Sequence, residues 1–306
     1  MRPRLSHRCC LVFLLVVAAV AASAAQLNRT QLWADQEIHA GWRLQRHVVF
    51  GVCRLLDREQ AARDFEWRGN CRAALAQAKL EQGLTPESRH LVLLLHGMGR
   101  STYLFRDMER SLRDAGYEAV AISYPSLTDD IAGHAAQIEE ILSRAEDVEK
   151  VSFVTHSLGG LVLREMLSRD GPWQQRLPLG RVVMIAPPNQ GSALAEALSG
   201  FTPFHWIGGP SASQIAAGPP FAPLPEAVEL AVIAGGTEGG GGFNPLLTGN
   251  NDGLVTVGET ALPGARDHMT IRALHTVIAG HPKSIAATIN FLGTGRLRRS
   301  AAKLNW

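Results

Sequence analysis

Residues 151–160 read Val-Ser-Phe-Val-Thr-His-Ser-Leu-Gly-Gly, and this stretch decides the fold. Its first half, Val151 to Thr155, is a short apolar run with β-branched side chains, which predicts a buried strand. The residues from Leu161 to Leu167 continue with helical spacing. Ser157 is therefore expected in a tight turn between a strand and a helix, with its hydroxyl exposed and the N-terminus of the helix directed at it.

The turn matches the Gly-x-Ser-x-Gly pattern of a nucleophile elbow except at the first position, where Thr155 replaces glycine. A β-branched residue suits the end of a strand but crowds the following helix more than glycine would. Gly159 and Gly160 carry no Cβ, so the backbone can turn sharply and pack closely there. The pattern predicts a nucleophilic serine, and an ordinary serine in a strand–turn–helix is the alternative.

Hydrophobic patterns on both sides of this turn predict strands that alternate with helices. Strands are expected at residues 91–95, 118–122, 181–185, 229–234 and 266–272, and helices at residues 101–115, 131–145 and 282–292. Such alternation is typical of a mostly parallel sheet of about six strands, covered by helices on both faces. Residues 200–226 are rich in glycine, proline and aromatic residues, which indicates either a small cap inserted over a site or a surface connection.

The N-terminus has the features of an export signal. Arg2, Arg4 and Arg8 precede an apolar run at residues 9–22, and Ala22-Ser23-Ala24 provides the small residues of a cleavage site. We therefore expect a signal peptide at residues 1–25 and a periplasmic or secreted protein. An uncleaved N-terminal membrane anchor is the alternative, although the apolar run is short for a membrane span.

Two cysteines, Cys53 and Cys71, lie outside the predicted signal peptide. A pair of cysteines in an exported protein predicts one disulfide, and two buried free thiols are the alternative. Apolar residues with helix-like spacing, followed by an alanine-rich run, predict a helical N-terminal extension at residues 26–88. These apolar residues are Leu44, Val48, Val49, Val52, Leu55 and Leu56. We expect this extension to precede a main domain at residues 89–295 and a tail at residues 296–306.

The composition narrows the classes of partner. The chain has 306 residues, of which 46% are hydrophobic and 19% charged, and a net charge of +2. These values describe an ordinary globular protein with room for one α/β domain and additions. Part of the positive charge belongs to the N-terminal arginines, so no nucleic-acid partner is predicted. No Cys-x-x-Cys or Cys/His spacing indicates a metal site.

A serine hydroxyl is a weak nucleophile and needs a base that is itself oriented by a third group. Proteins with a nucleophile elbow carry the serine, the acid and the histidine in that order along the chain. Asp252, in Asn250-Asn251-Asp252-Gly253, is the candidate acid because it follows Ser157 and precedes the candidate histidines. His268, His275 and His281 come next. We favour His275 because it lies in the loop between the last predicted strand and helix, whereas His268 falls within the strand and His281 adjoins the helix.

Two backbone N–H groups are needed to stabilise a developing oxyanion. Leu158, the residue after the serine, is one candidate donor. Met98, in the loop His96-Gly97-Met98-Gly99 after the first strong strand, is the other. Gly97 and Gly99 let this loop approach a substrate, and His96 is expected to brace it through a hydrogen bond. His156 and Gly159 are expected to support the serine turn.

These motifs together resemble the α/β-hydrolase superfamily, in particular bacterial serine hydrolases of the lipase and esterase type, over residues 90–293. The resemblance is carried by His96-Gly97-Met98-Gly99, Tyr124-Pro125-Ser126, Thr155-His156-Ser157-Leu158-Gly159-Gly160, Ala186-Pro187-Pro188-Asn189-Gln190-Gly191-Ser192, Asn251-Asp252-Gly253 and His275. It implies an α/β-hydrolase fold, hydrolysis of carboxylic esters by Ser157, Asp252 and His275, and no cofactor. Thr155 departs from the pattern, as does Met98, which stands where other esterases carry a third glycine.

The sequence therefore predicts an exported serine esterase or lipase that acts on a small-molecule or lipid ester with an apolar acyl chain. The cap at residues 200–226 is expected to make transient contact with a membrane surface. An acyltransferase or thioesterase with the same triad is one alternative, because the sequence does not determine the leaving group or the acceptor. A non-catalytic binding protein with the same fold is the other.

Overall fold

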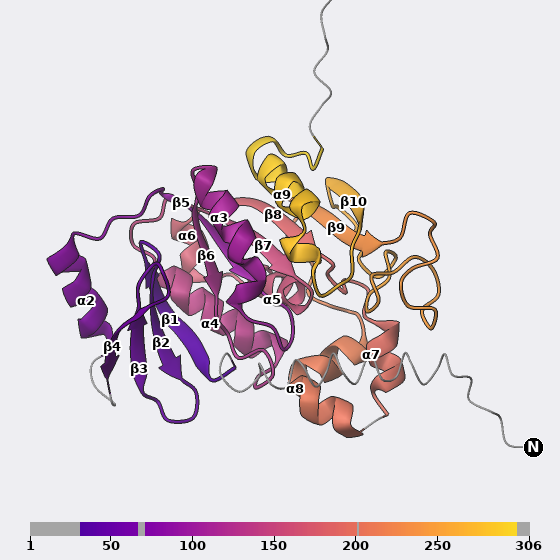
Figure 1. Cartoon of the computed structure of the whole chain (residues 1–306), viewed down its shortest axis with the longest axis horizontal. Coiled ribbons are helices and arrows are strands. Elements are labelled where there is room, and N and C mark those ends of the chain that lie inside the picture. Colours follow the sequence, from indigo (N-terminus) through magenta and orange to yellow (C-terminus); the bar gives the residue numbers. More distant parts are fainter. Residues whose placement is uncertain (1–30, 67–70, 201, 299–306) are drawn as a thin grey trace, which may run out of the picture.

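The computed structural model describes residues 31–66, 71–200 and 202–298, which form a four-stranded and a six-stranded sheet (Figure 1). The predicted signal peptide at residues 1–25 lies outside the described residues, as does most of the predicted tail at residues 296–306. No helix within the described ranges is both long enough and apolar enough to cross a membrane.

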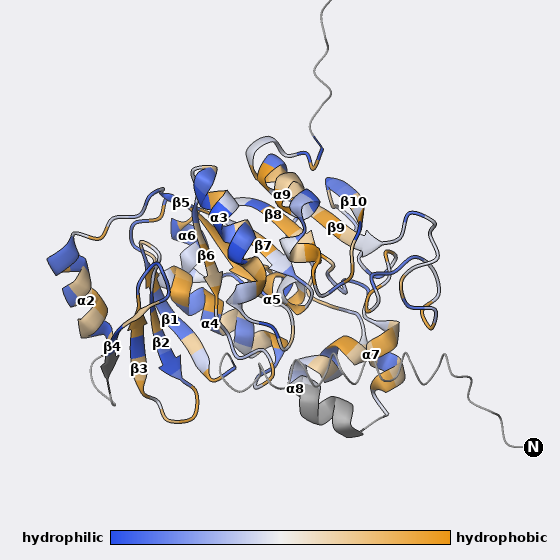
Figure 2. Ribbon diagram, in the orientation of Figure 1, coloured by the Kyte–Doolittle hydropathy of each residue, from blue (hydrophilic) through white to orange (hydrophobic). Residues whose placement is uncertain are grey.

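The six-stranded sheet has the strand order β10-β9-β8-β7-β5-β6, and all of its neighbouring strands are parallel. Its strands are β5 His90–Leu95, β6 Glu118–Ile122, β7 Lys150–His156, β8 Leu179–Ile185, β9 Leu230–Gly236 and β10 Asp267–Arg272. Every residue of β6 and β9 is buried, because parallel strands of this type are covered on both faces. Figure 2 shows the central strands mainly in the colours of hydrophobic residues.

Helices cover both faces of this sheet. Alternate residues of β5 separate the two cores: Leu91, Leu93 and Leu95 face one, and Val92 and Leu94 face the other. The first face is covered by α4 Ile131–Ser143, α5 Leu158–Leu167 and α6 Pro172–Arg176. The second is covered by η1 Thr102–Phe105, α3 Arg106–Asp114 and α9 Pro282–Thr294. The doubly covered parallel sheet expected from the sequence is confirmed.

The helical N-terminal extension predicted at residues 26–88 is wrong for most of its length. The chain forms an antiparallel sheet of β1 Trp33–His39, β2 Trp42–His47, β3 Cys53–Leu56 and β4 Ala62–Glu66, and only α2 Cys71–Gln82 is helical. Apolar residues of β2 and β3 pack beneath α2, whereas Arg43 and Gln45 on β2 are buried against the carboxylate of Asp35. β2 does alternate apolar and polar side chains, Trp42-Arg43-Leu44-Gln45, but over four residues only, and the helix-like spacing of the apolar residues from Leu44 onward outweighed this short pattern.

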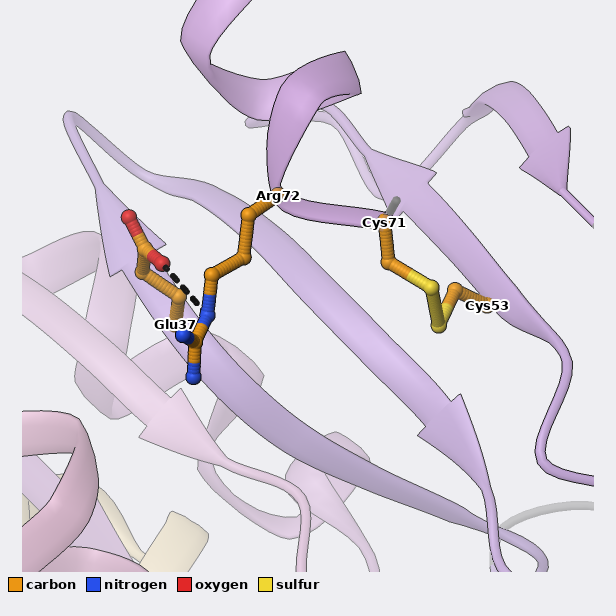
Figure 3. The surroundings of a disulfide bond; sticks show 4 residues. All are labelled: Glu37, Cys53, Cys71 and Arg72. Carbon is orange, nitrogen blue, oxygen red and sulfur yellow. Dashed lines mark ion pairs between the residues drawn. A yellow bond between two sulfur atoms is a disulfide. The ribbon is translucent and has the colours of Figure 1, made fainter. Parts of the chain in front are cut away.

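The predicted disulfide between Cys53 and Cys71 is confirmed. It joins β3 to the first residue of α2 across a Cα–Cα distance of 5.8 Å, beside the ion pair of Glu37 and Arg72 (Figure 3). The bond holds α2 on the antiparallel sheet. Disulfides persist in oxidising compartments, so this bond indicates an oxidising environment for the protein.

One helix, α8 Thr202–Ala217, occupies much of the segment predicted as a cap at residues 200–226, and α7 Ala193–Leu198 comes just before it. The α8 helix is kinked at Gly209. The Ser211 hydroxyl donates to the Asp129 carbonyl at 3.0 Å, and the Gln214 side chain accepts from the Ile131 N–H at 2.9 Å. These bonds attach α8 to the start of α4 and to the residues just before it, to one side of the six-stranded sheet (Figure 1).

Candidate active site

The residues singled out in the sequence lie beyond the carboxyl ends of the parallel strands. These ends meet at one edge of the sheet, where ligands of open α/β folds bind. The loop after β5 carries Met98, and the turn after β7 carries Ser157. Asp252 lies in the long connection between β9 and β10, and His275 follows β10.

Ser157 occupies a strained turn between β7 and α5. Its φ of 54° and ψ of −124° lie in a region that non-glycine residues rarely adopt, which costs on the order of 1–3 kcal/mol. The Ser157 N–H donates to the Ile185 carbonyl at 2.9 Å and so anchors the turn to β8. A Cβ on Gly159 would lie 2.3 Å from the Leu95 carbonyl oxygen, so only glycine lets α5 approach β5 this closely. Thr155, the departure from the elbow pattern, is buried in β7.

Asp252 and His275 form a buried hydrogen-bonded pair. The Nδ1–H of His275 donates to Oδ2 of Asp252 at 2.7 Å, and the two residues are 7% and 1% exposed. Oδ1 of Asp252 accepts from the N–H groups of Leu254 and Val255 at 3.0 and 2.8 Å. The His275 N–H also donates to the Asp252 carbonyl at 2.9 Å. Because Nδ1 carries the proton in this pair, Nε2 of His275 is left as the basic nitrogen.

Two asparagines hold the loop of Asp252 in place. The side-chain oxygen of Asn251 accepts from the N–H groups of Asn244 and Gly253, and that of Asn250 accepts from the Thr237 N–H. The sequence interpretation missed this role. The signal that could have found it is the Asn-Asn-Asp-Gly run, since asparagine side chains commonly bond to nearby backbone groups in turns.

His156 connects the serine turn to the histidine loop. Its Nε2–H donates to the backbone carbonyl of His275 at 3.0 Å, and the two rings lie 4.7 Å apart. Burial lowers the pKa of His156 well below its ordinary value of 6.5, so the ring is neutral near pH 7. The residue before Ser157 therefore holds the backbone of His275, a link that the sequence interpretation did not foresee.

The loop His96-Gly97-Met98-Gly99 lies directly against the serine turn. A Cβ on Gly97 would lie 2.9 Å from the Ser157 Cβ, which measures how closely the two segments approach. His96 Nδ1 is 2.9 Å from the Gly97 carbonyl, and its ring stacks on Tyr124 with centroids 4.3 Å apart. The Tyr124 hydroxyl donates to the His96 carbonyl. Burial lowers the pKa of His96 to about 4, so this histidine braces the loop as a neutral ring.

The two other candidate histidines lie in different surroundings. His268 is exposed on β10, where its Nε2 is 3.5 Å from the Thr260 hydroxyl. His281 caps the N-terminus of α9 by accepting from the Lys283 N–H at 3.1 Å. Within the part of the chain that the structure describes, no group of three or more His, Cys, Asp or Glu residues could hold a metal ion.

Comparison with solved structures shows the fold. The chain is similar to the mature form of the lipase BlEst2 of Bacillus licheniformis, with 21% identity and a TM-score of 0.53 over 67% of this chain and 91% of that one. Its propeptide form matches with 20% identity and a TM-score of 0.53, over 69% of this chain and 51% of that one. The chain thus has the α/β-hydrolase fold.

Comparisons of the amino-acid sequence do not identify an activity for this chain. A family model described as a domain of unknown function, DUF7379, matches residues 58–199. A comparison with curated proteins finds no match.

Proposed function

We propose that the protein is a serine hydrolase of carboxylic esters in which Ser157, His275 and Asp252 act as nucleophile, base and orienting acid. The observation that carries this proposal is the hydrogen bond from His156 to the carbonyl of His275. It joins the residue preceding the strained serine to the histidine that is already paired with Asp252. A nucleophile, a base and an oriented partner of the base are the groups that acyl transfer requires.

In the proposed reaction, Ser157 attacks the ester carbonyl while Nε2 of His275 accepts its proton. His275 then gives that proton to the leaving alcohol, and water cleaves the acyl-enzyme by the reverse sequence of proton transfers. Asp252 keeps the proton of the neutral ring on Nδ1 and stabilises the imidazolium that forms.

The N–H groups of Leu158 and Met98 are the proposed oxyanion donors. Leu158 is the first residue of α5, so its N–H has no acceptor within the helix. Met98 follows Gly97, whose backbone lies against the Cβ of Ser157. Donors placed where negative charge develops stabilise the transition state more than the ground state, and loss of one costs on the order of 10²–10³-fold in kcat.

Apolar side chains around the Asp252–His275 pair favour an ester with an apolar acyl chain. Leu254, Leu274 and Val277 flank the pair in sequence and are 38%, 46% and 55% exposed. Exposed aliphatic side chains beside a catalytic histidine offer a surface on which an acyl chain can lie. Contact of the segment at residues 200–226 with a membrane surface stays a prediction.

Export of the protein is part of the proposal, and the Cys53–Cys71 disulfide supports it. We expect a periplasmic or secreted enzyme. The alternative is that residues 1–25 stay attached as a membrane anchor. N-terminal sequencing of the protein from its native compartment would show whether residues 1–25 are removed or retained.

Ser157→Ala tests the proposed nucleophile. Hydrolysis of p-nitrophenyl esters of increasing chain length should fall by about 10⁴–10⁶ in kcat, and covalent labelling by a fluorophosphonate probe should disappear. Ser168→Ala is the matched control, because the hydroxyl of this exposed serine at the end of α5 donates to the nearby Glu165 carbonyl, away from the proposed site.

Retention of most activity in purified Ser157→Ala would contradict the nucleophile assignment. A folded wild-type protein that neither hydrolyses esters nor reacts with the probe would favour a binding protein. Faster transfer to an added alcohol or turnover of thioesters in preference to esters would favour the acyltransferase or thioesterase alternatives.

A further inference from the structure

β1 and the residues that lead into it run beside the residues that follow β6. The Ser123 hydroxyl donates to the Trp33 carbonyl at 2.9 Å, and the Asp35 N–H donates to the Ser123 carbonyl at 2.9 Å. The Ser123 N–H donates in turn to Oδ2 of Asp35 at 2.6 Å. Asp35 is fully buried and also pairs with the buried Arg43. The extension is thereby fastened to the edge of the main domain near its carboxyl-terminal side.

Gln31 lies at the start of this segment and reaches the turn that contains Met98. Its side chain is buried, its Nε2–H donates to the Arg100 carbonyl at 2.8 Å, and its Oε1 accepts from the Ser126 hydroxyl at 3.3 Å. The Ser126 oxygen accepts in turn from the Gly99 N–H at 3.0 Å. Because the Arg100 carbonyl can only accept, the Gln31 NH₂ group must be the donor to it, and the Gln31 side-chain oxygen faces Ser126. The Ser126 hydroxyl therefore donates to Gln31 and accepts from the Gly99 N–H.

These bonds hold the turn on the C-terminal side of the proposed oxyanion donor, Met98. The turn is closed by the Arg100 N–H, which donates to the Gly97 carbonyl at 3.2 Å, and Gly99 has a φ of 65°. The bond from Gly99 to Ser126 fixes the peptide plane that follows Met98, and the bond from Gln31 fixes the carbonyl of Arg100. Rotation of either plane would redirect the turn and, with it, the N–H of Met98.

The same turn is also tied to the loop of His275. The Arg100 guanidinium donates to the Thr276 carbonyl at 2.7 Å, one residue after His275. Gln31 thus bonds to the backbone of the residue whose side chain holds the histidine loop.

We propose that Gln31 is a positioning residue for the oxyanion turn, so that the N-terminal extension takes part in catalysis as well as in folding. This inference rests on the proposed function. Gln31 acts through the backbone of Gly99 and Arg100 and does not touch the substrate.

Gln31→Met tests the inference because it preserves side-chain length and removes both hydrogen bonds. An oxyanion contact strengthens in the transition state, so a misplaced donor lowers kcat. We expect a fall of about 10- to 100-fold in kcat for p-nitrophenyl esters, which is smaller than the roughly 10²- to 10³-fold fall expected when a donor is lost altogether. KM should change by less than about twofold, since ground-state binding does not depend on this contact. Rates should be expressed per active site, titrated with a fluorophosphonate, so that unfolded protein does not contribute.

Two further variants separate positioning from loss of structure. Gln36→Met is the matched control on β1, where the Gln36 amide bonds only to the neighbouring Asp35 carbonyl, and it should keep the wild-type kcat. Ser126→Ala interrupts the same chain of bonds and should lower kcat to a similar extent. The Gln31→Met/Ser126→Ala double variant should be no slower than the slower single variant, because both act through one chain of bonds.

A kcat for Gln31→Met within twofold of that for Gln36→Met would overturn the inference and leave the proposed function intact. An equal change in kcat and KM, or independent effects of the Gln31 and Ser126 substitutions, would also overturn it. Wild-type protein that shows neither ester hydrolysis nor labelling of Ser157 would overturn the proposed function, and the inference with it.

Discussion

Asp252→Asn should stop turnover while the fold persists, because the new amide can adopt only one orientation. In the native site, Oδ1 accepts from the N–H groups of Leu254 and Val255, and Oδ2 accepts from His275 Nδ1. The amide oxygen must stay at the Oδ1 position, since an NH₂ group there would face two N–H donors. The NH₂ group then faces His275 Nδ1, which has to accept a hydrogen bond. The ring proton moves to Nε2, and His275 can no longer take the proton of Ser157.

The expected loss in kcat is ~10⁴-fold, the size associated with a wrong histidine tautomer. This corresponds to about 5.5 kcal/mol in the activation free energy. Steady-state hydrolysis of a p-nitrophenyl ester at pH 7 measures kcat and KM, and thermal unfolding measures stability. The unfolding temperature should stay close to that of the wild type, because all three side-chain hydrogen bonds of residue 252 are kept.

Two controls make this prediction specific. Asp252→Ala removes the acceptor of two backbone N–H groups and should therefore lower stability as well, by about 1–3 kcal/mol for each group left unpaired. Asp267→Asn tests the same chemical change on β10, where Asp267 bonds to backbone N–H groups of His268 and Leu297, and should keep its activity. A folded Asp252→Asn with kcat within tenfold of the wild type would refute the tautomer argument. Unfolding of Asp252→Asn to the same degree as Asp252→Ala would refute the orientation argument.

Two predictions concern stability. Burial lowers the pKa of His96 to about 4 and that of His156 well below 6.5. Below about pH 6.5 these two histidines bind protons in the unfolded chain but stay neutral in the folded protein. The free energy of unfolding should therefore fall as the pH decreases from 6.5 toward 4, by about 3 kcal/mol for His96 alone. Urea unfolding at pH 7 and pH 4.5 measures this loss, and equal free energies of unfolding would contradict it. Replacement of both Cys53 and Cys71 by serine opens a cross-link between residues 18 apart and should lower the free energy of unfolding by about 3 kcal/mol. Mass spectrometry of the unreduced wild type should find no free thiol at Cys53 or Cys71. An unchanged urea midpoint in the double variant would contradict the expected loss of stability.

The elements of the main domain could be predicted because their signal lies in neighbouring residues. Residues 91–95 and 118–122 are almost wholly apolar, as a strand covered on both faces must be, and β5 and β6 form there. The disulfide could be predicted by counting, since Cys53 and Cys71 are the cysteines outside the predicted signal peptide.

The N-terminal sheet could not be predicted in this way. β2 is buried on both faces, but one of them consists of Arg43 and Gln45 bonded to Asp35, so its polar residues gave no sign of burial. Val48 and Val49, which entered the helix-like spacing, are exposed in the turn between β2 and β3. Burial of a charged pair depends on a partner elsewhere in the chain, and periodicity carries no information about that partner.

The sequence by itself determined the strands, the helices of the main domain and the turn at Ser157, because these depend on interactions within a few residues. The tertiary structure alone decided which side chains meet across the site. Asp252 and His275 are 23 residues apart in sequence, Gln31 and Arg100 are 69 apart, and His156 and His275 are 119 apart. The contacts of Asp252 and His156 with His275 follow from the strand order β10-β9-β8-β7-β5-β6, which brings the loops after β7, β9 and β10 to one edge of the sheet. The contact of Gln31 follows from the packing of β1 against the residues after β6. Hydrophobic periodicity reports which face of an element is buried, whereas the meeting of distant loops depends on how whole elements pack.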